Sequence, residues 1–283
     1  MVFFFRLLGC LPLAWVQGLG ALAGWLVYWA SPRYRRQLQA NLAQAGLGPE
    51  WRLPAAREAG KQVFELARIW TKTLAQTNAQ VVDVRGWEHV QAAQAAGKGI
   101  LFLTPHLGCF EITAQYYSAF GPITVLYRPP RQRSLQRMIL AGRKRPNLHL
   151  APADLAGVRA LIKALKKGEA VGMLPDQAPK VGEGVWLDFF GRPAYTMTLA
   201  ARLSETGATV LMAWGERLPG GGGYRLHFSP PGRALAGDTR ARAAQINHEI
   251  EALIRQCPAQ YLWGYNRYKR PAGAEPPPGA EAS

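Results

Sequence analysis

The fold is decided at residues 99–111, which read Gly-Ile-Leu-Phe-Leu-Thr-Pro-His-Leu-Gly-Cys-Phe-Glu. Four successive apolar residues without polar alternation are typical of a strand that is buried on both faces, as in a parallel sheet. Pro105 has no amide hydrogen for a sheet ladder, so the strand is expected to end before it. His106 is therefore predicted to lie at the carboxyl end of a buried strand, where open α/β sheets bind ligands.

His106 and Glu111 form the candidate catalytic pair. A helix is predicted over 109–120, and two residues five positions apart do not share a helix face. They can meet if His106 lies in the turn before the helix and Glu111 lies in its first turns. Such a pair fits a histidine general base that a carboxylate orients. For the spacing by itself, a chance occurrence is the simpler explanation.

Composition indicates a folded, strongly basic protein. The 283 residues are 48% hydrophobic, which excludes general disorder. The 34 Lys and Arg against 18 Asp and Glu give a formal net charge of +16, which favours anionic partners such as nucleic acid, anionic lipid, a phosphorylated substrate or an acidic carrier protein. The three cysteines fit neither a disulfide framework nor a metal site, and Cys109 is expected to be a small buried residue rather than a nucleophile.

Residues 1–30 are predicted to form an N-terminal membrane anchor. The segment 7–30 is apolar except for Gln17, and about 20 such residues span a bilayer as a helix. Basic residues follow it at 33–36, which predicts that the bulk of the chain lies on the cytoplasmic side. A cleaved signal peptide is the alternative, and the glycines of the segment leave spanning or surface insertion open.

Residues 31–270 are expected to form one α/β domain, in which a mixed, largely parallel sheet is flanked by helices. Residues 33–77 have helical periodicity, and alternating elements begin at Val81. The expected strands are 81–84, 99–103, 123–126, 148–150, 170–174, 186–189, 209–213 and 224–228, and the expected helices are 87–96, 109–120, 131–143, 155–167, 195–206 and 239–257. No phosphate-binding glycine motif follows a strand, and 271–283 is predicted to be a disordered tail.

Three further polar residues are expected at the same sheet edge as His106. Arg128 follows the strand 123–126, Arg145 closes a basic run, and Asp176 follows the strand 170–174. The arginines fit phosphate binding, and Asp176 fits binding of a substrate hydroxyl or orientation of a basic residue. A solvated loop, cations at a helix C-terminus and a turn-forming aspartate are the simpler alternatives.

The ordered set of motifs resembles the bacterial late acyltransferases of lipid A biosynthesis, the lauroyl/myristoyl transferase family within the lysophospholipid acyltransferase-like superfamily. The resemblance covers nearly the whole chain and also includes its apolar N-terminus. The motifs that carry it are His106-Leu-Gly-Cys-Phe-Glu111, Tyr127-Arg128-Pro129, Leu161–Gly168, Pro175-Asp176-Gln177, Phe189-Phe-Gly191 and Tyr261-Leu-Trp263 with Arg267 and Lys269. The chain departs from many members at Tyr265-Asn266, before Arg267, which bears on acyl or acceptor preference.

The resemblance implies a glycerolipid acyltransferase-like fold and an O-acyltransferase at the inner membrane. It implies transfer of a fatty acyl chain from acyl carrier protein to a hydroxyl of a lipid A precursor of the Kdo-lipid A type. His106 would be the general base and Glu111 its orienting partner, and Arg128, Arg145 and Asp176 would bind or position substrate. Neither a metal nor a dissociable cofactor is required.

Two other functions are compatible with parts of the sequence. A glycerolipid acyltransferase that makes phosphatidate-type lipids from acyl-CoA or acyl carrier protein would share the His-acid motif. A membrane-tethered nucleic-acid-binding protein would use the charge and the aromatic-basic stretch 261–270.

Overall fold

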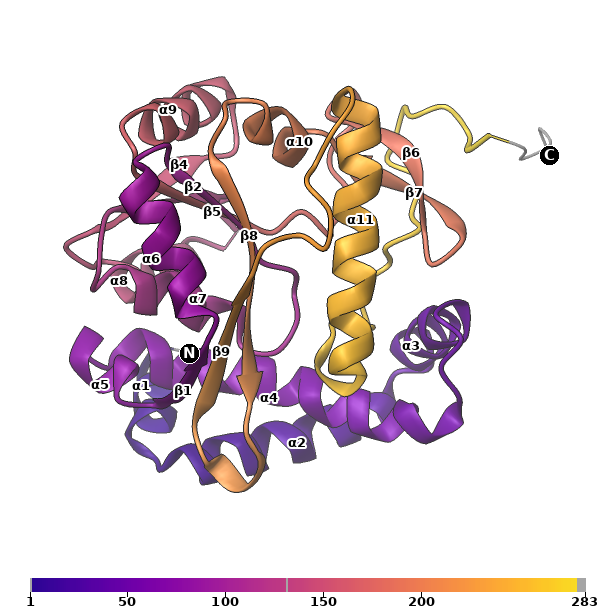
Figure 1. Ribbon diagram of the computed structural model, residues 1–283. Helices are drawn as coiled ribbons and strands as arrows, with labels where there is room; N and C mark the ends of the chain where they lie inside the picture. Colours follow the sequence, from indigo (N-terminus) through magenta and orange to yellow (C-terminus); the bar gives the residue numbers. More distant parts are fainter. Residues whose placement is uncertain (1, 131, 279–283) are drawn as a thin grey trace.

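The core of the molecule is a seven-stranded sheet between two layers of helices (Figure 1). The computed structural model describes residues 2–130 and 132–278. The strand order is β1-β9-β8-β2-β5-β3-β4, and all neighbours from β8 to β4 are parallel. Strand β9 is antiparallel to β8, and β1 is parallel to β9. The predicted mixed, largely parallel α/β sheet is confirmed.

The strands and helices follow the alternation that the sequence predicts from Val81 onward. The strands are β1 Val81–Arg85, β2 Ile100–Leu103, β3 Ile123–Tyr127, β4 Leu148–Pro152, β5 Ala170–Met173, β6 Gly184–Phe189, β7 Arg192–Met197, β8 Thr209–Arg217 and β9 Tyr224–Ser229. The helices are α1 Val2–Cys10, α2 Leu13–Ala30, α3 Pro32–Gln44, α4 Arg52–Thr71, α5 Leu74–Asn78, α6 Trp87–Ala96, α7 Phe110–Tyr117, α8 Arg133–Gly142, α9 Leu155–Lys166, α10 Leu199–Ser204 and α11 Thr239–Gln256.

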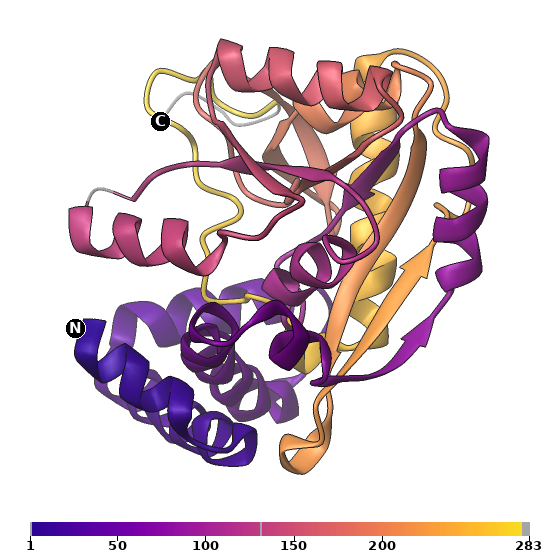
Figure 2. The same cartoon turned by 90° about the vertical axis from the view of Figure 1, so that its left-hand side faces the viewer.

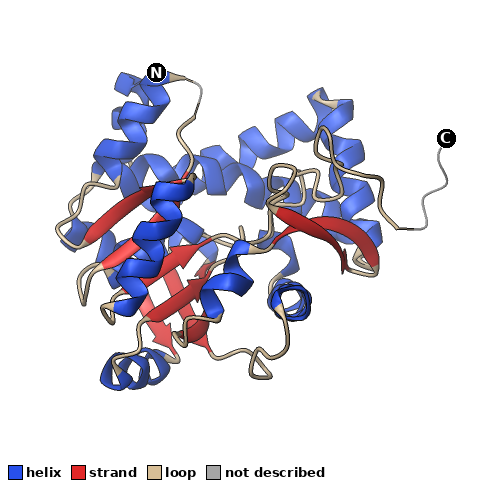
Figure 3. Cartoon of the chain, turned by 90° about the horizontal axis from the view of Figure 1, so that it is seen from above, coloured by secondary structure: helices blue, strands red, loops and turns tan. Residues whose placement is uncertain are grey.

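Strand β2 is buried on both faces because helices cover both sides of the sheet. Leu101 and Leu103 pack in the core cluster that also contains residues of α9, α10 and α11. Ile100 and Phe102 point the other way, into the cluster with residues of α6 and α7. Figure 3 shows the sheet from above with helices on both sides. An unbroken apolar run is what a strand in this position requires.

The predicted helix 195–206 is wrong in its first part. Tyr195 and Thr196 belong to β7, which pairs with β6 in a two-stranded antiparallel hairpin apart from the main sheet (Figure 3). Phe190 and Gly191 form its turn, and both have positive φ, 49° and 71°. Two-residue hairpin turns need such angles, but Phe is unusual there, so the usual Asn-Gly signal is missing. The helix α10 begins only at Leu199.

The N-terminal apolar segment is two helices rather than one. Helix α1 ends at Cys10 and α2 begins at Leu13, with Pro12 at the N-cap of α2. Helix α2 is long and apolar enough to cross a membrane by length and composition. It lies alongside α4 at the bottom of Figure 1, and Figure 2 shows the N-terminal helices as one layer beside the α/β core.

A buried ion pair fastens α4 to the sheet. The guanidinium of Arg217, in β8, donates from Nε to Glu65 Oε2 at 2.7 Å and from Nη2 to Glu65 Oε1 at 3.0 Å. Nη1 donates to Glu58 Oε2 at 2.6 Å. Burial acts to lower the pKa of Arg217, but the two carboxylates outweigh it and raise the pKa above its usual value. The Arg217 guanidinium thus remains charged at neutral pH.

The C-terminal segment 271–278 has no helix or strand, but it touches the hairpin. The indole Nε1 of Trp186, in β6, donates to the Glu275 carbonyl at 3.0 Å. The predicted disorder of 271–283 stays a prediction, and 279–283 lie outside the described residues.

Replacing Arg217 by Leu should destabilise the protein strongly. The substitution leaves the buried Glu65 carboxylate without its partner, and breaking a buried pair in this way costs about 3–5 kcal/mol. Chemical denaturation of the purified variant measures the loss. Arg225→Leu, which breaks a half-exposed pair with Asp83, is the control and should lose much less. Equal losses would contradict the anchoring role of Arg217.

Candidate active site

His106 and Asp176 meet because their strands are neighbours. Strands β2 and β5 are parallel with Leu103 opposite Met173, so the residues that follow both strands emerge at one sheet edge. Asp176 Oδ1 lies 2.8 Å from His106 Nδ1, and the backbone amide of His106 donates to Asp176 Oδ2 at 2.9 Å. One carboxylate therefore fixes both the ring and the backbone of His106.

The other ring nitrogen of His106 faces Gln177. The Nε2 atoms of the two side chains are 3.2 Å apart. A carboxylate at Nδ1 favours the neutral tautomer with its proton on Nδ1, which leaves the lone pair of Nε2 to accept from the Gln177 amide. The His106 side chain is 15% exposed and Asp176 is 2% exposed. The His106 side chain is thus partly exposed, whereas its carboxylate partner is shielded from water.

Burial and the neighbouring His106 shift the pKa of Asp176 in opposite directions. Burial acts to raise the pKa of Asp176, but the charge of His106 and hydrogen bonds from its ring and amide outweigh it. The pKa of Asp176 therefore lies below its usual value of 3.8. The carboxylate is ionised at neutral pH, as a partner that stabilises an imidazolium must be.

The loop that carries His106 is held from two sides. Gln62 of α4 donates from Nε2 to the Gly108 carbonyl at 2.9 Å. From the stretch that follows α11, the Leu262 amide donates to the His106 carbonyl at 3.1 Å. Gly108 has a φ of 59°, and a methyl group there would lie 2.0 Å from the Gly215 carbonyl oxygen. Position 108 therefore requires glycine, both for its positive φ and for the close approach of the Gly215 backbone.

Glu111 does not orient His106, contrary to the sequence prediction. Its carboxylate accepts from Arg143 Nε at 2.9 Å and Nη2 at 2.6 Å, and from the indole of Trp70 at 2.9 Å. Glu111 is in the first turn of α7, on the side of that helix that faces Arg143 at the end of α8 and Trp70 of α4. The carboxylate beside the ring is instead Asp176, 70 positions away in sequence.

The two predicted arginines are placed differently. Arg145 precedes β4 and so lies at the amino end of that strand, not at the edge of His106. Its guanidinium donates to Gln115 Oε1 at 2.7 Å and to the carbonyls of Ile69 and Lys72. Arg128 follows β3 as expected, and its side chain is 59% exposed. Arg128 Nη2 lies 4.0 Å from Glu183 Oε2 in an exposed ion pair, whereas Arg145 ties α4 and α7 together.

Four residues of the site have no role assigned from the sequence, namely Gln62, Trp70, Arg143 and Gln177. Gln177 is adjacent to Asp176, and Arg143 belongs to the basic run 143–145. Nothing in the run distinguishes the arginine that pairs with Glu111 from its neighbours. Gln62 and Trp70 lie on a helix whose packing partner is a tertiary feature.

The aromatic-basic stretch 261–270 is largely structural. Leu107 forms a bridge with Tyr261, next to the loop of His106. Arg267 is buried and donates to the Tyr195 carbonyl at 2.8 Å and to Thr196 Oγ1 at 2.7 Å. Lys269 lies over the ring of Tyr265. These contacts account for most of the stretch without nucleic acid.

A cavity of about 730 Å³ lies between α1, α4 and α8, next to the ion pair of Glu111 and Arg143. Trp70, which donates to Glu111, forms part of its wall. The cavity combines apolar and aromatic side chains with three cations, Arg6, Lys72 and Arg137. Such a lining suits an amphiphile with an anionic headgroup.

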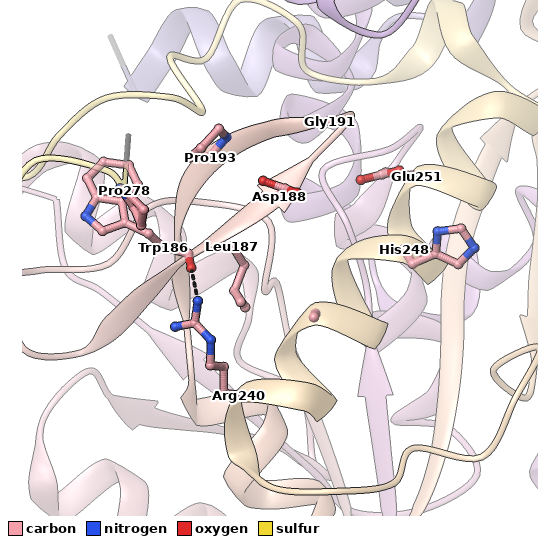
Figure 4. Close-up of a pocket in the computed structure, with 10 residues that line it drawn as sticks. Trp186, Leu187, Asp188, Gly191, Pro193, Arg240, His248, Glu251 and Pro278 are labelled. Atoms are coloured by element: carbon pink, nitrogen blue, oxygen red, sulfur yellow. Dashed lines mark hydrogen bonds between the residues drawn. The ribbon is translucent and has the colours of Figure 1, made fainter. Parts of the chain in front are cut away.

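A second cavity, of about 630 Å³, lies on another side of the molecule, between the β6–β7 hairpin and α11 (Figure 4). His248 and Glu251 face it from α11, and Arg240 donates to the Trp186 carbonyl at 3.1 Å. Glu251 also accepts from the Phe190 amide at 2.7 Å, so it supports the hairpin turn. None of the residues predicted from the sequence for the active site lines this cavity.

Cys109 is not placed for nucleophilic chemistry. It is buried, and burial raises the pKa of its thiol well above the usual value. Within 2–130 and 132–278, no group of three or more His, Cys, Asp or Glu is placed to hold a metal ion.

The fold and the site define an α/β protein with a histidine–aspartate pair at the carboxyl edge of a largely parallel sheet, an arrangement suited to general-base catalysis. A model of the family "Bacterial lipid A biosynthesis acyltransferase" matches residues 1–270. The chain therefore belongs to the bacterial lipid A biosynthesis acyltransferase family.

Curated proteins that are similar to this chain include two lipid A acyltransferases. The chain is 33% identical over 201 residues to the lipid A biosynthesis lauroyltransferase of Escherichia coli (strain K12), covering 69% of this chain and 64% of that protein. It is 31% identical over 196 residues to the lipid A biosynthesis palmitoleoyltransferase of the same organism, covering 68% and 63%. A phosphatidylinositol mannoside acyltransferase of Mycolicibacterium smegmatis is 25% identical over 276 residues, covering 87% and 89%. The matches to the two E. coli proteins thus span less than two thirds of their lengths.

The stability contributed by Asp176 should depend on pH. Because its pKa is lower in the folded than in the unfolded state, the ionised carboxylate stabilises the fold above the unfolded value of 3.8. This contribution is lost as the pH falls through the folded-state pKa. The gap in unfolding free energy between wild type and Asp176→Asn should therefore narrow from about pH 6 to about pH 3, measured by denaturant titration. A gap that stays constant or widens would contradict the assignment.

Proposed function

We propose that this protein transfers a fatty acyl chain from acyl carrier protein to a hydroxyl of a lipid A precursor of the Kdo-lipid A type. The reaction would take place on the cytoplasmic side of the inner membrane. The observation that carries the proposal is the His106–Asp176 pair, in which the His106 side chain is partly exposed, in a chain of the lipid A acyltransferase family.

His106 acts as the general base. A hydroxyl is a weak nucleophile at neutral pH, so Nε2 removes its proton as the oxygen attacks the thioester carbonyl. Asp176 stabilises the imidazolium that forms. The tetrahedral intermediate then collapses, the C–S bond breaks, and the imidazolium returns the proton to the departing thiolate. One ester forms, one thioester is lost, and His106 ends neutral.

Glu111 acts by positioning. Its bonds to Arg143 and Trp70 fix the start of α7 against α8 and α4. The neighbouring residue, Phe110, lies with its ring centroid 4.9 Å from that of His106. Glu111 thereby holds the wall of the site against which the His106 ring rests.

Gln177 is our candidate donor to the oxyanion. In the free protein its amide lies 3.2 Å from His106 Nε2, which is the place that the reacting hydroxyl must occupy. The backbone amides of His106, Gly108 and Cys109 already donate to Asp176, Gln260 and Gly215. When the hydroxyl displaces it from Nε2, the Gln177 amide becomes available to the carbonyl oxygen of the thioester.

Both proposed substrates suit the charges of the protein. The cavity with Arg6, Lys72 and Arg137 would receive the phosphorylated disaccharide, and Arg128 would contact the same ligand or the donor. Arg145 is not proposed for this role because its guanidinium is already bonded. The net charge of +16 favours an acidic carrier protein as donor.

The proposal is tested by an acyl-transfer assay with purified protein, acyl carrier thioester and lipid A precursor. His106→Ala should lower the rate by about 10²–10⁴-fold, the usual contribution of a general base. Asp176→Asn should lower kcat with little change in the KM for the acceptor. Glu111→Gln and Arg143→Met should each lower activity. The double variant should be as active as either single variant, because both substitutions break the same Glu111–Arg143 pair.

Parallel reactions with lysophosphatidate and with phosphatidylinositol mannoside separate the alternative acceptors. Transfer to lysophosphatidate alone would overturn the proposal in favour of a glycerolipid acyltransferase. Full activity of His106→Ala would exclude the mechanism.

Gln177→Leu should reduce kcat by about 10²–10³-fold while leaving the KM values nearly unchanged, because the lost bond forms mainly in the transition state. Gln177→Asn, which retains an amide on a shorter side chain, is the control and should recover part of the rate. If Gln177→Leu instead raised KM with kcat unchanged, Gln177 would be a binding residue rather than an oxyanion donor.

A further inference from the structure

Helix α2 has two apolar faces with different surroundings. The buried face carries Val16, Gly20, Gly24 and Tyr28, which recur at helical spacing. The opposite face exposes large apolar side chains, namely Trp15, Leu19, Leu22, Trp25, Leu26 and Trp29. Leu22 is 53% and Leu26 is 51% exposed. A contiguous apolar surface of this size marks an interaction site.

The buried face of α2 is fitted to α4 by small residues. A methyl group on Gly24 would lie 2.1 Å from the Ala56 carbonyl oxygen, and one on Gly60 would lie 2.0 Å from the Gly20 carbonyl oxygen. Helix α1 also packs closely on α4 through a glycine, because a methyl group on Gly9 would lie 2.8 Å from the Ala67 carbonyl oxygen. The backbones of α1 and α2 thus each lie directly against that of α4, as in tightly packed helix pairs.

This packing opposes a transmembrane orientation of α2. Helix α4 runs beside α2 and carries the charged side chains of Glu58, Lys61 and Glu65. If α2 crossed the bilayer with α4 attached, these charges would enter the hydrocarbon at a cost of several kcal/mol. If α2 crossed alone, the seam would have to open. In addition, its 18 residues reach only about 27 Å, slightly less than the hydrocarbon thickness of about 30 Å.

The charge around the apolar face suits an anionic bilayer surface. The first 49 residues contain four arginines, Arg6, Arg33, Arg35 and Arg36, and no carboxylate side chain. The guanidinium of Arg35 lies 5.7 Å from the ring centroid of Trp29. Arginine beside tryptophan at the rim of an apolar face is typical of a helix that lies in the membrane interface.

We propose that α1, α2 and the adjoining side of α4 form an in-plane membrane seat, and that α2 does not cross the bilayer. The exposed face sinks into the acyl-chain boundary while the arginines bind anionic headgroups. An apolar groove of about 450 Å³ between α1, α2 and α4, lined by Leu7, Leu11, Leu19 and Phe64 among others, receives lipid acyl chains. The inference rests on the membrane location of the proposed function but not on its chemistry.

Topology is tested with the full chain carrying one protease-cleavable tag before Met1 and another after Ser283. In inverted inner-membrane vesicles, both tags should be cut by added protease, and in spheroplasts both should be protected. A spanning α2 would instead protect the N-terminal tag in inverted vesicles and expose it in spheroplasts. That result would overturn the proposal.

The seat itself is tested by flotation with phosphatidylglycerol-containing vesicles. Leu22→Glu/Leu26→Glu should reduce binding at least about tenfold, because the two exposed leucines would no longer enter the acyl-chain boundary and two carboxylates would have to. Leu155→Glu is the matched control, because Leu155 is 77% exposed on α9, and it should bind like wild type. Acyl transfer to detergent-dispersed substrate should persist in both, which separates this test from that of the proposed function.

Two further outcomes would overturn the proposal. One is unchanged vesicle binding by the double variant with an unaltered melting temperature. The other is a shift from dimer to monomer in light scattering without loss of vesicle binding, which would assign the face to a second copy of the chain.

Discussion

The site depends on two hydrogen bonds that the carboxylate of Asp176 accepts from His106. Asp176 accepts a hydrogen bond from the backbone amide of His106 and a second from its ring, and so fixes the position, orientation and tautomer of the base. The bond is possible only because β2 and β5 are adjacent, parallel and in register up to Leu103 and Met173. The doubly covered sheet is therefore what brings together two residues 70 positions apart.

Helix α4 links this site to the N-terminal helices. Its Gln62 bonds the carbonyl of Gly108, its Trp70 bonds Glu111, and its Glu65 is paired with Arg217 of the sheet. The same helix receives α2 along a seam of glycines. One rigid element therefore joins the proposed membrane seat to the proposed catalytic loop, which would place the base at a fixed height above the bilayer.

The sequence predicted the elements that have a strong periodic or apolar signal. The strand at 100–103, the helix 87–96 and the position of His106 at a strand end followed from local pattern alone. The predicted strand 186–189 lies within β6, but its partner β7 is missed because Phe190 stands where a turn residue is expected. The partner of His106 was assigned to Glu111 because spacing along the chain cannot reveal which strands are neighbours. Asp176 was correctly placed at the sheet edge, but its contact with His106 depends on strand order.

The most direct test of the role of His106 is the tautomer of its neutral ring, measured by ¹⁵N NMR of the histidine-labelled protein. We expect the proton of the neutral ring to lie on Nδ1, which leaves Nε2 unprotonated, and we expect Asp176→Asn to abolish this preference. A ring protonated at Nε2, or one that Asp176→Asn leaves unchanged, would contradict the role of His106 as a base held by Asp176.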